Sequence, residues 1–135
     1  MIEAALVLPL VLLLVFGILE FGWMFLVLQQ VTHGARAGAR IAVTADATTA
    51  SVLAAVQDMM TDRGIGGLEP VEISPAGEVA DLDSGTVVTV TVKVRYADVG
   101  LKIPLFAAFA PTYLRASVSM AKEGKREPEI GRILR

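Results

Sequence analysis

The sequence contains no cysteine and only one histidine, His33, and these shortages exclude several kinds of site. Without cysteine the chain forms no disulfide and offers no thiolate to a metal. His33 has no second histidine or cysteine with which to share a metal, so we expect it on a helix surface. We therefore predict no metal and no other cofactor.

Catalytic motifs are also missing. No Ser–His–acid set, P-loop or Rossmann fingerprint occurs, because the glycine-rich GIGG at 64–67 lacks the strand before it and the helix after it that such a loop needs. Asp81 and Asp83 could bind calcium weakly, but an EF-hand loop needs more oxygen ligands and a closing glutamate. A turn between strands is the better interpretation, and we predict that the protein is not an enzyme.

Positive charge is absent from the first 35 residues, where the only acids are Glu3 and Glu20. These two acids account for the net charge of −2, so the remainder is neutral and gives no electrostatic reason to expect nucleic-acid binding. Residues 41–100 hold nine acids and three bases, whereas residues 101–135 hold seven bases and three acids. Such segregation can serve head-to-tail contacts between copies, although a solvated surface is the more common cause.

The hydrophobic run from Ala4 to Leu28 contains one charged residue, Glu20. As a helix it would span about 37 Å, more than the ~30 Å hydrocarbon core of a bilayer. A secretory signal peptide is the alternative, but this run is too long and lacks a basic region before it and a small-residue cleavage site after it. We predict one retained membrane-spanning helix, with residues 1–28 in the membrane.

Proline is absent between Pro9 and Pro70, so this helix can continue beyond the membrane over residues 29–43. Pro9 removes one backbone hydrogen bond, and we expect a kink or a melted turn there. Small residues favour close approach of another helix, which we expect to come from a second copy. The glycines concerned are Gly17, Gly22, Gly34 and Gly38, the last two spaced as GxxxG.

A small α+β domain is predicted over residues 44–122. Asp46 or Thr48 would cap a second helix, which would bury Val52, Val56 and Met59. Three strands follow, each with apolar residues at alternate positions, and the helices should cover the apolar face of their antiparallel sheet. These apolar positions are Val71 and Ile73, then Val88, Val90, Val92, Val94 and Tyr96, then Leu114, Ala116, Val118 and Met120.

Two segments remain. The apolar loop GLKIPLFAAFAPTY at 100–113 would fill the core, contact the membrane or meet a partner, in that order of preference. The tail at 123–135 is charged and interrupted by Gly124, Pro128 and Gly131, so we expect it to be flexible. The predicted fold class is therefore α+β, with a long N-terminal membrane-spanning helix, a second short helix and a small three-stranded antiparallel sheet.

The first 40 residues resemble the N-terminal region of TadE-like pseudopilins of tight-adherence pilus systems, in the type IV pilin-like superfamily. The matching features are Glu3, ALVLPL with Pro9, FGILEFG with Gly17 and Glu20, and GARAGAR ending at Arg40. The chain departs from the family at Trp23, where the family has a basic residue.

The resemblance implies a structural subunit, either a minor pilin or a filament subunit, that assembles with other pilin subunits through its N-terminal helix. It also implies contact with a prepilin peptidase and the pilus assembly machinery. Its location would be the inner membrane, with the C-terminal domain outside the cytoplasm, or an extracellular pilus. Arg36 and Arg40 follow the span, and by the positive-inside rule they would place the C-terminal domain in the cytoplasm. Long domains, however, translocate largely regardless of such charges. The alternative is a single-pass, membrane-anchored module that binds an extracellular ligand.

The resemblance also gives the two acids a role. In pilin-like proteins the acid near the mature N-terminus pairs with a neighbouring subunit's terminal amine, which implies this partner for Glu3; a place among lipid headgroups is the alternative. Glu20 would need a backbone group, a proton or a base from a displaced copy. The candidate assembly residues are thus Glu3, Pro9, Gly17, Glu20, Gly22, Gly34, Arg36, Gly38 and Arg40.

Overall fold

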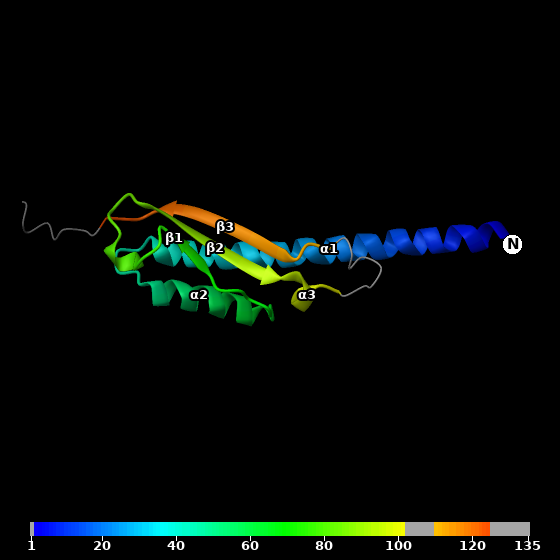
Figure 1. Ribbon diagram of the computed structural model, residues 1–135, viewed down its shortest axis with the longest axis horizontal. Coiled ribbons are helices and arrows are strands. Elements are labelled where there is room, and N and C mark those ends of the chain that lie inside the picture. The colour runs from blue at the N-terminus through cyan, green and yellow to red at the C-terminus, as the bar shows by residue number, and fades with distance from the viewer. Residues whose placement is uncertain (1, 102–109, 125–135) are drawn as a thin grey trace, which may run out of the picture.

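The structure is a computed structural model that describes residues 2–101 and 110–124. Its longest element is helix α1 (Ile2–Ala42), whose 41 residues make it about 60 Å long (Figure 1). The helix thus continues to residue 42, close to the predicted end at residue 43, while the position of residues 29–43 beyond the membrane stays a prediction. Pro9 lies inside α1, and the helix is regular on both sides of it, so the melted turn expected there is not formed.

Helix α2 (Thr49–Asp62) begins at a capping box. The Thr48 hydroxyl accepts from the Ser51 backbone N–H, and the Ser51 hydroxyl accepts from the Thr48 backbone N–H, so two donors at the helix start are satisfied. Thr48 is therefore the cap, not Asp46. The buried side chains of α2 are Val52, Val56 and Met60, which corrects the predicted Met59 by one position.

Three strands form the antiparallel sheet in the order β1–β2–β3. They are β1 (Glu72–Ser74), β2 (Val87–Arg95) and β3 (Tyr113–Ala121), and a short 3-10 helix η1 (Val79–Asp81) lies between β1 and β2. Val90 of β2 lies opposite Ile73 of β1 and Val118 of β3, so the predicted apolar positions share one face. The strand ends one residue earlier than predicted, because Tyr96 begins the one-turn helix α3 (Tyr96–Val99).

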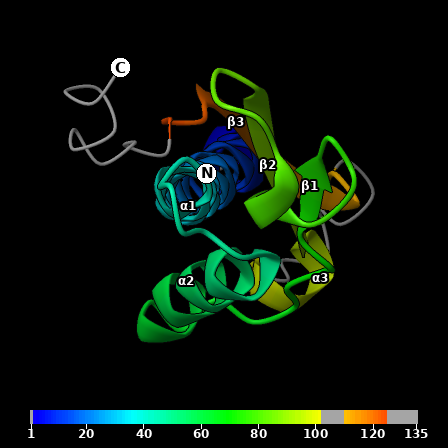
Figure 2. The ribbon, with the colours of Figure 1, turned by 90° about the vertical axis from the view of Figure 1, so that its left-hand side faces the viewer.

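The apolar face of the sheet packs against α1, and α2 packs against another side of the same helix (Figure 2). Alternate valines of β2 are fully buried in this core, together with small residues of α1 such as Ala35 and Ala39. Small side chains on α1 let both neighbours come close to its backbone. The predicted α+β fold, with a long apolar helix, a second helix and a three-stranded antiparallel sheet, is confirmed, but the sheet packs mainly on α1 and not on both helices.

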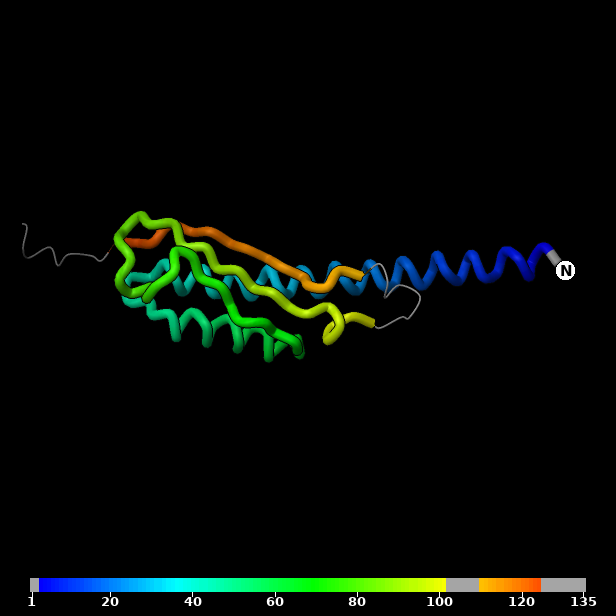
Figure 3. The backbone as a smooth tube through the Cα atoms, in the orientation of Figure 1, coloured from blue at the N-terminus to red at the C-terminus, as the bar shows by residue number. Residues whose placement is uncertain are grey.

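The N-terminal half of α1 projects beyond the other described elements (Figures 1 and 3). From Glu3 to Leu19 every residue is exposed except the half-buried Gly17, and Glu20 is the first residue of α1 that the rest of the chain buries. Further along, Val27 is also buried in the core. The globular part therefore begins to cover α1 well before residue 28.

Parts of two predicted segments lie outside the described residues. These parts are residues 102–109 of the apolar loop and residues 125–135 of the charged tail. The roles expected for both segments stay predictions.

Candidate functional site

Side-chain hydrogen bonds hold the globular part against α1 at the end nearest the exposed N-terminal half of the helix. The Tyr96 hydroxyl donates to Glu20 Oε1, and Trp23 Nε1 donates to the backbone oxygen of Val99 at 2.6 Å. We call these four residues the junction. The one-turn helix α3 supplies Tyr96 and Val99, and Gly100 follows it where an added Cβ would lie only 2.9 Å from the Tyr96 ring. A glycine at this position lets the chain pass close to the ring.

Glu20 is a buried carboxyl group with one identified partner. Its side chain is 8% exposed, and Oε2 has no hydrogen-bond partner within the described ranges 2–101 and 110–124. The partners expected from the sequence were a backbone group, a proton or a base from another copy; the structure instead provides the phenol of Tyr96 in the same chain. One feature of the sequence could have indicated this partner. Tyr96 is the last of the alternating apolar residues of the second strand, and its hydroxyl is the one polar group among their side chains.

Burial, together with the hydrogen bond to Glu20, raises the pKa of Tyr96 to about 12. In the unfolded chain a tyrosine ionises near pH 10. The stabilisation associated with the protonated phenol is therefore complete below pH 10 and is lost as the pH rises from 10 towards 12.

We predict that the free energy of unfolding falls more steeply above pH 10 for the wild type than for Tyr96→Phe. The difference should be on the order of 2 kcal/mol by pH 12, since one pKa unit corresponds to about 1.4 kcal/mol. Denaturant titrations of both full-length chains in detergent, at pH 8 and at steps up to pH 12, measure it. Parallel pH profiles for the two chains would contradict a buried, protonated phenol.

Gly34 and Gly38 lie at the contact between α1 and α2 of the same chain. A Cβ at Gly38 would lie 2.6 Å from Val56 Cγ2, and one at Gly34 would lie 3.0 Å from Met60 Sδ. Close helix approach at these glycines is thus observed, but the partner is α2 and not the second copy that was expected. Both glycines are buried within the chain, so neither surface is open to another subunit.

The other glycines and bases of the candidate set lie on exposed or partly exposed parts of α1. Gly22 has open space around it among the described residues, and Gly17 is half-buried. Arg36 and Arg40 are exposed, and neither forms an ion pair in the part of the chain that the structure describes. Assembly roles for these four residues and for Glu3 and Pro9 stay predictions.

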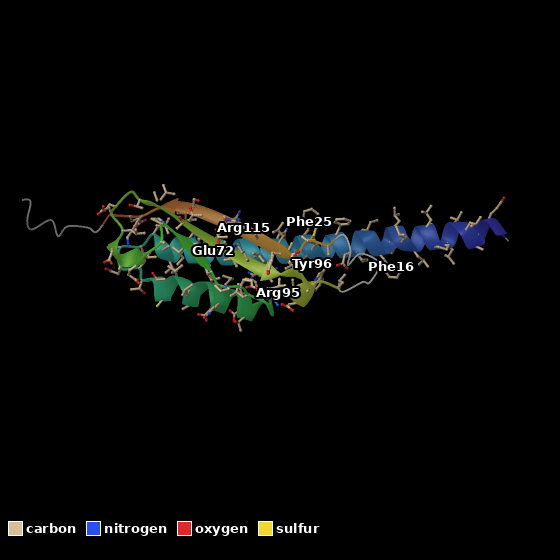
Figure 4. All side chains as sticks on the ribbon, viewed as in Figure 1. Phe16, Phe25, Glu72, Arg95, Tyr96 and Arg115 are labelled. Atoms are coloured by element: carbon tan, nitrogen blue, oxygen red, sulfur yellow. The ribbon has the colours of Figure 1, made fainter. Side chains whose placement is uncertain are left out.

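The exposed N-terminal half of α1 is apolar on all sides. Side chains project from it around the helix, Phe16 among them, and Leu6, Leu10 and Ile18 are each more than 60% exposed (Figure 4). A helix that is apolar all round belongs in a membrane or in a bundle of similar helices. Within the described residues, α1 is long and apolar enough to cross a membrane, and such a surface is suited to membrane anchoring.

The family of TadE-like proteins matches residues 1–40, so the predicted resemblance is confirmed over this stretch. The match contains the exposed apolar half of α1, Glu20 and both buried glycines. No curated protein and no solved structure is similar enough to the chain to match it.

Proposed function

We propose, from the TadE-like character of residues 1–40, that this protein is a membrane-anchored, pilin-like subunit of a tight-adherence pilus or a related secretion system. It would be either a minor subunit or a filament subunit. The observation that carries the proposal is the division of one continuous helix at Glu20. Before Glu20 the helix is apolar and exposed, and after it the helix forms part of the core of a small domain.

The exposed part of α1 has the length that a bilayer requires. Residues 3–19 span about 26 Å as a helix, close to the ~30 Å hydrocarbon core. Trp23 lies just beyond, and tryptophan favours the membrane–water interface. We therefore place the end of the membrane segment near residues 20–23, earlier than the residue 28 expected from hydropathy, with the junction at the interface.

The same surface can serve two environments in succession. Lipid tails and the apolar helices of neighbouring subunits are chemically similar, so a helix exposed on all sides can leave the bilayer for a filament core without exposing this surface to water. By resemblance, the subunit would reside in the inner membrane with its domain outside the cytoplasm. A prepilin peptidase and the assembly machinery would act on it. The role is structural, and no residue is assigned to catalysis.

The test is electron microscopy of filaments from cells that express the chain and from cells that lack it. We expect filaments to be lost without the chain, or to carry it, as detected by antibody labelling. Leu10→Arg should abolish this incorporation, because an arginine at the centre of a spanning helix costs about 2.5–3.5 kcal/mol on insertion scales. Leu10→Ile is the matched control. The proposal would be contradicted if the cells form normal filaments that do not contain the protein. The protein would then be the alternative, a membrane-anchored module that binds an extracellular ligand.

A further inference from the structure

The second half of α1 has a basic face that no described element covers. His33, Arg36 and Arg40 are exposed and fall along one side of the helix, with Gln29 one turn before them. In Figure 2, α2 lies below α1 and the sheet lies to its right, so the left-hand side of α1 is open among the described elements. We call His33, Arg36 and Arg40 the basic face.

Helix α2 carries a complementary acidic face. Asp58 and Asp62 are exposed, one turn apart, on the side of α2 opposite its buried residues. Within the described residues the ion pairs join Lys93 to Glu72 and Arg95 to Glu69 on the sheet, so neither aspartate has an ionic partner there. Two unpaired acids and two unpaired arginines are thus displayed on different sides of the molecule.

We propose that the basic face of one copy docks on the acidic face of a second copy, with Arg36 opposite Asp62 and Arg40 opposite Asp58. The proposal rests on the proposed function, because that function gives neighbouring copies in a filament the same orientation. The spacing fits, since each pair of like charges is four residues apart, which is about 6 Å along a helix. α2 runs antiparallel to α1, so both contacts form together only in this pairing.

The contacts within one chain also fix the axial offset between the two copies. Gly34 lies opposite Met60 and Gly38 lies opposite Val56, so Asp58 is level with Arg36 of its own chain. Two copies at equal height would therefore form one ion pair. A shift of four residues, about 6 Å along α1, brings both pairs together. We infer that neighbouring copies are staggered by this amount, the copy that supplies the acids lying further from the membrane.

A second copy fits the basic face better than an anionic membrane does. Arg36 lies 16 residues beyond Glu20, which is about 24 Å along the helix axis. Electrostatic attraction to a charged surface decays over a Debye length of about 8 Å at physiological salt. If the junction lies at the interface, the bases are too far from the headgroups to be held by them.

Charge reversal in the full-length chain, reconstituted in lipid vesicles, tests the contact. Reversing the bases (Arg36→Asp with Arg40→Asp) or the acids (Asp58→Arg with Asp62→Arg) should lower association between copies by about tenfold or more, because like charges then face each other. Reversing all four residues in one chain, or mixing the two reversed chains, should restore association. Energy transfer between labelled copies measures it, and Glu69→Lys with Arg95→Glu is a control in which an ion pair within the chain is swapped.

The register has its own test, because the chain contains no natural cysteine. A copy with Arg40→Cys and a copy with Asp58→Cys should form a disulfide in high yield on oxidation. A copy with Arg36→Cys should form a disulfide with the same Asp58→Cys copy in lower yield. Equal association of the reversed and wild-type chains would overturn the contact. So would a loss of association, on reversal of the bases alone, that occurs in vesicles of anionic lipid and not in neutral vesicles, which would make the basic face a membrane contact. Crosslinking through Leu14→Cys, in the exposed apolar half of α1, separates the two possible failures. If copies still crosslink there although the charge reversals have no effect, only this interface fails. If they do not crosslink there, the proposed function fails as well.

Discussion

Replacing Glu3 with glutamine is expected to lower incorporation of the subunit into filaments by about two orders of magnitude or more. Glu3 lies in the first turn of α1, at the far end of the exposed apolar half. In a bundle of such helices its carboxylate would be out of water, and by resemblance a neighbouring subunit's terminal amine is the partner. Removing one member of a buried ion pair costs roughly 3–5 kcal/mol, and each 1.4 kcal/mol is a factor of ten in an equilibrium.

Insertion into the membrane should survive the same change, since glutamine keeps the size of the side chain and removes a charge. Carbonate extraction of membranes measures insertion, and quantitative immunoblotting of purified filaments measures incorporation. Asp83→Asn, which removes an exposed acid from the turn before β2, is the matched control and should change neither quantity. If the Glu3→Gln chain enters filaments at wild-type levels, Glu3 instead lies among headgroups.

Gly38→Leu should produce the second large effect, a loss of roughly 3 kcal/mol or more in the free energy of unfolding. Overpacking a well-packed core usually costs 1–3 kcal/mol and sometimes more. Here even the first added carbon would lie 2.6 Å from Val56 and 3.1 Å from Val90, on two different elements. The higher helix propensity of leucine, about 1 kcal/mol relative to glycine, acts in the opposite direction and is outweighed.

Thermal unfolding of the full chain in detergent measures this loss, at about 4–8 °C in Tm per kcal/mol for a domain of this size. Gly22→Leu is the matched control in the same helix, because Gly22 has open space around it within the described part of the chain. It should leave Tm unchanged. A Gly38→Leu chain with the wild-type Tm would show that α1 and α2 do not pack as described.

The sequence predicted the elements because each leaves a local pattern. The absence of proline after Pro9 set the length of α1, and alternation of valine and threonine set β2. The choice between Met59 and Met60 was not settled by the pattern, since both positions are compatible with a helical period of 3.6 residues. Packing against Gly34 selects Met60.

Contacts between residues far apart in the sequence were harder to predict than helices and strands. The GxxxG spacing of Gly34 and Gly38 indicates that something approaches closely, but it does not say whether this is another copy or α2. The bond between Tyr96 and Glu20 joins residues 76 positions apart, and only the folded sheet brings the end of β2 to that point on α1. Such contacts depend on topology, which no local pattern records.

The parallel course of α1 and the sheet has a mechanical consequence. β2 and β3 run along α1, and their nine-residue ladder lies lengthwise beside the helix (Figure 3). In a filament of the kind proposed, tension would act along α1 and therefore along the strands. Force in that direction loads the hydrogen bonds of the ladder together in shear, whereas force across the strands would peel them apart one after another. The small domain is thus oriented to resist the direction in which a pilus is pulled.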